Sequence, residues 1–238
     1  MADNVYTVNK INDTTYQIDE MGRDFCYLLL GEEKALLIDC SIGTDDLKKV
    51  VKEITSLPLT VAATHGHTDH TGGAWQFKKI YIPKPDCKPA LKIYATRNYR
   101  EKLLSNRMRK NGISKKDIKG HLYDCKWIAF EDGKEFDLGN RTVKAVFTPG
   151  HSVGSCIFLD EKEKMMFTGD NTLSYLLITV KPCTTLETWL CGAEKTLALS
   201  KEYEPWSAHG EGKQTSEQIS HTISLVRQIM EKYPQNTK

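Results

Sequence analysis

A dense group of potential metal ligands occupies the segment Thr64-His65-Gly66-His67-Thr68-Asp69-His70-Thr71-Gly72-Gly73. Three of the seven histidines of the chain, together with one aspartate, fall within six consecutive residues of this segment. Neutral imidazole and carboxylate are ligands that suit zinc and related divalent cations, and one tight turn presents them at fixed angles. The apolar run before the turn reads as a buried strand, and ligands at the carboxyl end of a strand are typical of α/β sites. The segment therefore predicts a metal site rather than a solvent-exposed loop.

Three later residues extend this candidate site, namely His151, Asp170 and His209. Each one follows a predicted strand and stands close to a glycine. Taken alone, such a residue is more often a turn or capping residue than a ligand. Their joint occurrence favours one shared site. Asp39 closes an earlier strand, and two roles stay open for it: it accepts the outer N–H of a ligand histidine, or it caps a turn.

The order of the predicted elements indicates two sheets with helices on their outer faces. An amphipathic helix begins near Asp45 and ends before Pro58, and two late helices follow the capping boxes Thr184-x-x-Glu187 and Thr215-x-x-Gln218. Strands are predicted at 25–30, 35–38, 60–63, 127–130, 135–138, 142–147, 156–159 and 165–167, of which those from 126 to 170 form a second strand-rich region. Because each element has one apolar face to bury, we expect a four-layer α/β/β/α sandwich.

The residues of the candidate metal site resemble those of a known family. The pattern His65-x-His67-x-Asp69-His70, followed by His151, Asp170 and His209, resembles the metal-ligand set of the metallo-β-lactamase superfamily of hydrolases, over Phe25 to Gly210. The resemblance implies that His65, His67 and His151 hold a first metal ion. It implies that Asp69, His70 and His209 hold a second one, and that Asp170 bridges both. It also implies an αβ/βα sandwich with the site at its open edge.

At several positions this chain differs from individual subfamilies, and these differences limit which reaction and which metal we expect. True metallo-β-lactamases usually lack the bridging aspartate, so Asp170 argues against antibiotic hydrolysis. Flavodiiron proteins have glutamate where this chain has His67, which favours zinc over a diiron centre. Only 29 residues follow His209, which argues against the glutathione-binding domain of glyoxalase II. Persulfide dioxygenases share the first histidine-rich turn and use one iron, so they remain the main alternative.

The predicted function is that of a binuclear zinc metallo-hydrolase, with iron or manganese as alternative metals. A metal-bridging hydroxide would cleave an ester, lactone, thioester or related bond in a small-molecule substrate. Asp69 would orient the hydroxide and transfer a proton as well as bind metal. The alternatives are an iron-dependent dioxygenase acting on a persulfide and, less favoured, a phosphodiesterase or nuclease.

The charge of the chain is distributed unevenly. Lysine and arginine exceed aspartate and glutamate by 33 − 31 = +2, but residues 87–120 alone contain eleven basic and two acidic residues, or +9. We predict one domain over 1–238, with 87–125 as a helical insertion or lid. A solvated helix face is the favoured interpretation, and a lid that attracts an anionic substrate is the alternative. The sequence argues against a nucleic-acid partner, because Tyr94 and Tyr99 are the only aromatic residues in this stretch.

The remaining composition is that of a globular protein, with 39% hydrophobic and 27% charged residues. It has neither an apolar run long enough for a membrane span nor a secretory leader at its start, so a cytoplasmic location is expected and no membrane partner. The seven cysteines form no Cys-x-x-Cys pair and are expected to be reduced core residues. His121 and Tyr175 are further candidates for substrate contact, with packing roles favoured. The oligomeric state stays open.

Overall fold

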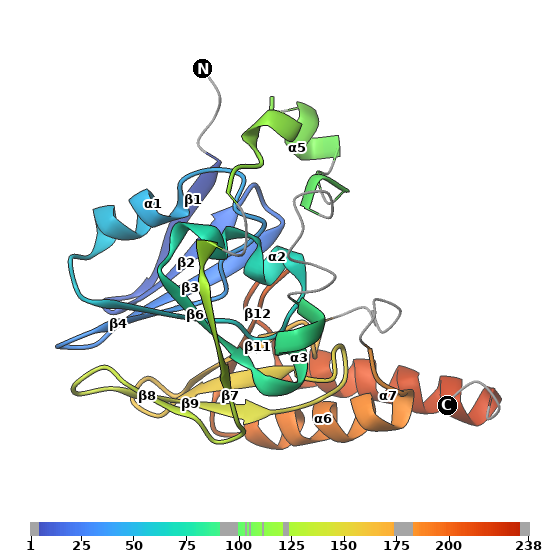
Figure 1. Cartoon of the computed structure of the whole chain (residues 1–238). Helices are drawn as coiled ribbons and strands as arrows, with labels where there is room; N and C mark the ends of the chain where they lie inside the picture. The colour runs from blue at the N-terminus through green and yellow to red at the C-terminus, as the bar shows by residue number, and fades with distance from the viewer. Residues whose placement is uncertain are drawn as a thin grey trace.

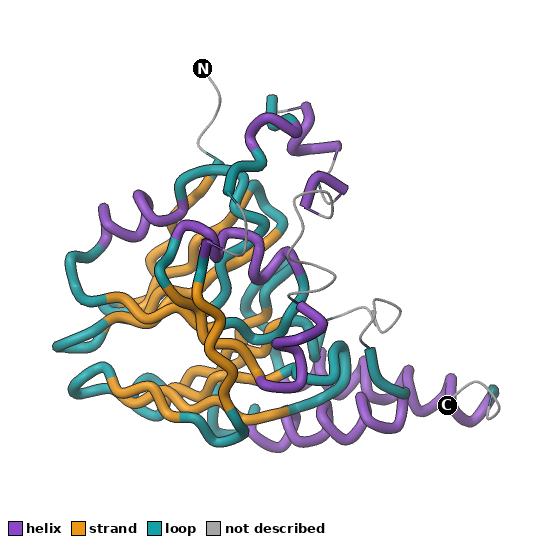
Figure 2. Tube along the Cα trace, viewed as in Figure 1, coloured by secondary structure: helices purple, strands orange, loops and turns teal. Residues whose placement is uncertain are grey.

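Two β-sheets lie face to face in the computed structural model, which describes residues 5–90, 100–102, 104, 106–110, 112–120, 124–173 and 183–233. One sheet has seven strands in the order β1-β2-β3-β4-β5-β6-β7, and the other has five in the order β12-β11-β10-β9-β8. Figures 1 and 2 show the sheets stacked, with α1 outside the first sheet and α6 and α7 outside the second. The predicted four-layer sandwich is confirmed.

The first sheet begins as an antiparallel meander and continues with parallel strands. Its strands are β1 (Tyr6–Asn12), β2 (Thr15–Glu20), β3 (Asp24–Leu30), β4 (Ala35–Ile38), β5 (Leu59–Ala62), β6 (Lys79–Pro83) and β7 (Lys126–Phe130). Helix α1 (Leu47–Ile54) joins β4 to β5, and the Asp46 side chain accepts a hydrogen bond from the Lys49 N–H at its start. Such a connection returns the chain in the same direction, as a parallel pair requires.

The second sheet is antiparallel except for its last strand. It contains β8 (Glu135–Asp137), β9 (Thr142–Phe147), β10 (Cys156–Asp160), β11 (Met165–Gly169) and β12 (Glu204–Ser207), the last parallel to β11. Helices α6 (Leu186–Leu199) and α7 (Ser216–Lys232) pack on its outer face. The predicted capping box at Thr215 and Gln218 is confirmed. The cap of α6 is Thr185 and not Thr184 as predicted, because the Thr184 hydroxyl donates instead to the Gly150 carbonyl.

Three apolar clusters separate the layers. Aromatic side chains including Phe136, Phe158 and Phe167 fill the space between the sheets. A second cluster, containing Leu47 and Val51 of α1, lies on the outer face of the first sheet, and a third lies under α6 and α7. Four cysteines are buried in this interior as expected, but Cys191 is exposed and Cys87 and Cys183 are half-buried.

Some elements were missed or misplaced by the sequence analysis. The sequence does not predict strands β1, β2 and β6, and it gives no bounds for the strand expected before His209, which is β12. Residues 126–130 were grouped with the later strands, but they form β7, which pairs with β6 in the first sheet. An apolar run shows that a strand exists without showing its partner, so this assignment was open to error. The proline-rich stretch after β6 forms a short helix, α3 (Lys84–Pro89), with Pro85 in its first turn, where proline is tolerated.

The basic segment contains short helical elements, α5 (Asn106–Lys110) and η3 (Lys115–Asp117), in the part that is described. Arg100 does not belong to a solvated face, because its side chain is completely buried and donates to the carbonyl groups of Gly72, Lys119 and Gly120. The boundaries 1–238 and 87–125 stay predictions. Among the described residues, no helix combines the length and the apolar character needed to cross a lipid bilayer.

Candidate metal centre

The predicted ligands come from loops at the same edge of both sheets. The segment 65–70 follows β5, His151 follows β9, Asp170 directly follows β11, and His209 follows β12. Within the first segment, α2 (Thr68–Thr71) begins after His67 and carries Asp69 and His70. The structure therefore brings all seven predicted side chains together, in three overlapping groups whose ligand atoms lie within 4.8 Å of one another.

The first group consists of three imidazoles. His67 Nδ1 lies 3.1 Å from His65 Nε2 and 2.8 Å from His151 Nε2. His65 and His151 are each only 1% exposed, so these ring nitrogens meet in a nearly dry pocket. Lone pairs that converge in this way suit a cation of borderline softness such as Zn²⁺.

The second group combines imidazoles with carboxylates. Asp170 Oδ1 lies 3.3 Å from His70 Nε2 and 3.1 Å from His209 Nε2, while its Oδ2 lies 3.5 Å from His151 Nε2. Asp69 lies farther out, 3.9 Å from each of His70 Nε2 and His209 Nε2. Asp170 thus stands between the two groups, in the position that the resemblance implied for it.

Outer contacts orient three of the rings. His70 Nδ1 lies 2.9 Å from Asp39 Oδ2, and His209 Nδ1 lies 2.7 Å from the Arg23 carbonyl oxygen. The Thr64 hydroxyl donates to Asp39, so it can accept from His65 Nδ1, which is 3.1 Å away. Each Nδ1 then carries the proton, and each Nε2 presents its lone pair to the site.

The pKa values of the histidines differ between the two groups. Burial lowers the pKa of His65 well below its usual range and that of His67 to about 3, so both rings are neutral. Burial acts in the same sense on His70 and His209, but the negative charge of Asp170 outweighs it and raises both pKa values well above the usual range. The pKa of Asp170 is correspondingly well below its usual range, because His209 and His70 overcome the effect of burial.

These observations test whether the residues suit a metal ion. Buried carboxylates at Asp39 and Asp170 need nearby positive charge, and without a cation its nearest source is a proton on His70 or His209. His70 Nε2 and Asp170 Oδ1 are also buried, and apart from the ion pairs at 3.1–3.3 Å just described neither atom has a hydrogen-bond partner. A divalent cation would provide the charge and accept both lone pairs. The donor set therefore fits a metal.

The sequence model of the metallo-beta-lactamase superfamily matches residues 22–208. The chain belongs to the metallo-β-lactamase superfamily. The human acyl-coenzyme A thioesterase MBLAC2 is 23% identical over 213 residues, 82% of this chain and 76% of that protein. The atrochrysone carboxyl ACP thioesterase of Aspergillus fumigatus is 31% identical over 163 residues, 67% of this chain and 42% of that protein. The chain spans 50% and 56% of the length of two fungal lactamase-like proteins that it also matches.

A solved structure agrees with this assignment. A metallo-beta-lactamase from Pontibacter korlensis superposes with a TM-score of 0.68 at 17% identity, covering 93% of this chain and 99% of that one. At this identity the similarity shows the fold alone. The predicted membership of the metallo-β-lactamase superfamily is confirmed.

Asp39 takes the first of its two predicted roles in this superfamily member. Its carboxylate accepts from His70 and also from the Thr64 N–H, at 2.7 Å. The residue has a φ of 62°, a left-handed conformation that is uncommon for a side chain other than glycine. This backbone turns the carboxylate toward the histidine-rich segment.

A second buried carboxylate near the ligands was missed by the sequence analysis. Asp86 in α3 accepts from the Gly66 N–H at 2.8 Å, the Gly154 N–H at 2.8 Å and the Ser152 hydroxyl at 2.6 Å. It therefore connects the loop that carries His65 and His67 to the loop that carries His151. No local signal marks this residue, because its partners are 20 to 68 positions away in sequence.

Other predicted contacts have different outcomes. Tyr175 and His121 lie outside the described residues. Phe77 is buried in the outer cluster of the first sheet. In the stretch Met21-Gly22-Arg23, the Arg23 carbonyl accepts from His209 and so contributes to the site directly.

Proposed function

We propose that this chain is a metal-dependent hydrolase of carboxylic thioesters. The observation that carries the proposal is the convergence of seven imidazole and carboxylate side chains at one edge of the sandwich. Two relatives named as thioesterases, one acting on acyl-coenzyme A and one on an acyl carrier protein substrate, favour a thioester over the other bonds considered. The partner would be a small-molecule acyl thioester.

Two zinc ions are the proposed cofactors. His65, His67 and His151 would hold the first ion, and Asp69, His70 and His209 the second, with Asp170 shared. Bound zinc would supply a water-derived nucleophile at neutral pH and polarise the carbonyl of the scissile bond.

The residues of the chain provide orientation and a dry environment. Asp39, Thr64 and the Arg23 carbonyl fix the outer nitrogens of three rings, so the inner nitrogens hold their directions without reorganisation. The low exposure of His65, His70 and His151 excludes bulk water from this side of the site. Electrostatic interactions gain strength in such surroundings.

Asp69 is proposed to move the proton. Its side chain is 21% exposed, against 4% for that of Asp170, so it faces the open side of the site. Burial opposes ionisation, but His70 and His209 hold the pKa of Asp69 below its usual value, so the group is ionised and has the lone pairs needed to accept a proton from attacking water. Water adds to the carbonyl carbon, the C–S bond breaks, and the products are a carboxylic acid and a thiol. A thiol has a pKa of about 8.5, so its departure needs little acid assistance.

The proposal is tested by zinc content and thiol release. We expect the purified, zinc-loaded chain to hydrolyse octanoyl-coenzyme A faster than a lactone, a β-lactam or a phosphodiester. Chelation should abolish this activity and added zinc should restore it. Asp170→Ala should lose bound zinc, and its activity should fall at least about 100-fold. The substitution removes the carboxylate that lies between the two groups of candidate ligands.

The matched control is Asp13→Ala, which removes an exposed carboxylate whose ion-pair partner is Lys10. It should keep the zinc content and activity of the parent chain. Well under one equivalent of bound zinc, iron or manganese would refute the metal site. Oxygen uptake with glutathione persulfide, without thioester cleavage, would assign the chain to the dioxygenase alternative.

A further inference from the structure

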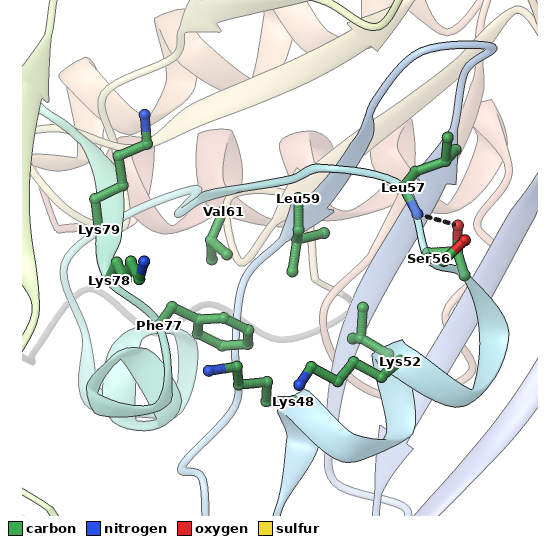
Figure 3. A pocket seen from close by; sticks show the side chains of 11 residues that line it. Lys48, Lys52, Ser56, Leu57, Leu59, Val61, Phe77, Lys78 and Lys79 are labelled. Atoms are coloured by element: carbon green, nitrogen blue, oxygen red, sulfur yellow. Dashed lines mark hydrogen bonds between the residues drawn. The ribbon is translucent and has the colours of Figure 1, made fainter.

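A cavity of about 600 Å³ lies on the outer face of the first sheet, away from the histidines. It is bounded by α1, by β5 and by the segment that follows η1 (Gly72–Gln76). Figure 3 shows Leu59 and Val61 of β5 along one side, with the Phe77 ring facing them across the cavity. Small-molecule sites commonly occupy roughly 300–1,000 Å³, so this space can accept a ligand.

The floor of the cavity is apolar. Val51, Val61 and Phe77 belong to the buried core, and Leu57 and Leu59 are half-buried against it. A ligand must therefore offer an apolar body to cover this floor, because transfer of apolar surface out of water is the main favourable term available there.

The rim of the cavity is basic. Its lining includes Lys48 and Lys52 from α1 and Lys78 and Lys79 from the other side, and it contains no acidic residue. Figure 3 shows the Lys48 and Lys52 side chains extending from α1 toward the Phe77 side of the cavity. The Lys79 ammonium lies 5.5 Å from the Tyr81 ring, so it is directed elsewhere. Like charges without an acidic counterpart attract an anion to this rim.

Lys49, on the other side of α1, differs from the lysines at the cavity rim. Lys49 forms an ion pair with Glu53 on the same helix at 3.9 Å and does not line the cavity. Glu53, the acidic residue of α1, therefore pairs with a lysine on the side of the helix that faces away from the cavity. The cavity side keeps its positive charge.

We propose that this cavity binds a single-chain anionic amphiphile. The alkyl chain would lie against Leu59, Val61 and Phe77, and the anionic head would meet the ammonium groups of Lys48 and Lys52. The Thr55 hydroxyl accepts from the Leu57 N–H at 3.2 Å and keeps its own hydrogen to donate to the head group. None of the seven candidate metal ligands lines the cavity, so this site is separate from the proposed active site.

Calorimetric titration of the zinc-loaded chain tests the proposal with four twelve-carbon probes below their aggregation concentrations. Dodecanoate or dodecyl phosphate should bind with one-to-one stoichiometry, and the stronger of the two identifies the head group. Dodecanol should bind more weakly, and dodecyltrimethylammonium should not bind. Shortening the chain should weaken binding by up to about fourfold per methylene, since each buried methylene contributes to transfer.

Variants locate the binding. The double variant Lys48→Ala with Lys52→Ala should weaken dodecanoate binding about 3- to 30-fold, because it removes two exposed charge interactions with the head group. The control Lys49→Ala should leave binding unchanged. Binding should also persist in Asp170→Ala, which separates this site from the metal centre. Unchanged binding in the double variant, equal binding of the cationic probe, no saturable binding, or loss of binding in Asp170→Ala would each overturn the proposal.

Discussion

Asp39 and Asp86 are two buried carboxylates that both accept from the backbone of the same histidine-rich loop, and they act on it differently. Asp39 accepts from the N–H of Thr64, and Asp86 accepts from the N–H of Gly66, so the two flank His65 along the chain. Asp39 also contacts an imidazole, that of His70. The recorded hydrogen bonds of Asp86 go only to main-chain groups and to the Ser152 hydroxyl.

This difference separates two ways of organising a metal site. A carboxylate at a ring nitrogen fixes the tautomer and orientation of one ligand. A carboxylate at backbone N–H groups fixes the loops that carry several ligands. We therefore expect changes at Asp39 to appear mainly in metal affinity, and changes at Asp86 to appear mainly in stability.

Asp86→Ala should have the largest effect on stability. It leaves the N–H groups of Gly66 and Gly154 and the Ser152 hydroxyl without their acceptor in a buried region. Each buried group left unpaired costs about 1–3 kcal/mol, so we expect a loss of about 3–5 kcal/mol in the free energy of unfolding, measured in urea. A loss below 1 kcal/mol would show that Asp86 does not hold the loops together.

Glu20 provides a third buried carboxylate, one without an imidazole partner. It accepts from the N–H groups of Ile42 and Thr44 and from the hydroxyls of Thr44 and Tyr6. Burial, and then the negative charge of Asp24, raise the pKa of Glu20 from 4.5 to about 7. The folded chain thus keeps a proton that the unfolded chain releases near pH 4.5, so stability should fall as the pH rises from about 4.5 to about 7 and then level off.

Glu20→Gln should remove this contribution to the pH dependence. A difference of about 2.5 in pKa corresponds to about 3 kcal/mol between pH 4 and pH 8, measured as the change in the free energy of unfolding relative to the parent chain. The variant loses the acceptor for the Ile42 N–H at every pH, so the slope rather than the level is compared. Parallel pH profiles for the two chains would mean that Glu20 is ionised throughout this range.

Asp39→Asn should act on metal affinity instead. An amide group in place of the carboxylate directs an N–H toward either Thr64 or His70, and beside His70 it favours a proton on Nε2, the nitrogen that faces the site. Loss of such an outer partner commonly lowers metal affinity 10- to 100-fold. We expect this loss for the second zinc ion in a chelator competition, with the first ion less affected.

The control for Asp39→Asn is Asp86→Asn, which keeps an amide oxygen as acceptor and contacts no imidazole in the recorded hydrogen bonds. It should reduce stability more than Asp39→Asn does and reduce affinity for the second zinc ion less. Equal losses of affinity in the two variants would remove the distinction between the two carboxylates.

The contrast between Asp39 and Asp86 also explains how far the sequence could lead. The ligand residues and Asp39 lie just beyond the ends of strands, and glycines stand close to the ligands, so their positions followed from local patterns and the family resemblance. The four-layer fold followed from the order of the elements. Asp86 lies between prolines in a stretch that resembles a linker, and its role depends on loops brought close only by the packing of both sheets. The partner of β7 and the basic cavity beside α1 depend on tertiary packing in the same way.

Ser152→Ala should have the smallest effect on the free energy of unfolding. It tests directly how Asp86, unlike Asp39, holds two loops together. The Ser152 hydroxyl donates to Asp86 Oδ2 at 2.6 Å and lies 2.9 Å from the Ser155 hydroxyl, next to His151 in sequence. Loss of one hydrogen bond to a charged group contributes about 1.5–3 kcal/mol, but the backbone N–H groups of Gly66 and Gly154 still pair with the carboxylate, so we expect about 1 kcal/mol. A double-mutant cycle with Asp86→Ala, which removes the acceptor, measures the coupling between the two side chains by urea unfolding. A coupling near zero would mean that Asp86 holds the His151 loop through the Gly154 N–H alone, whereas a coupling near 1 kcal/mol would show that the hydroxyl contributes to the connection between the two histidine loops.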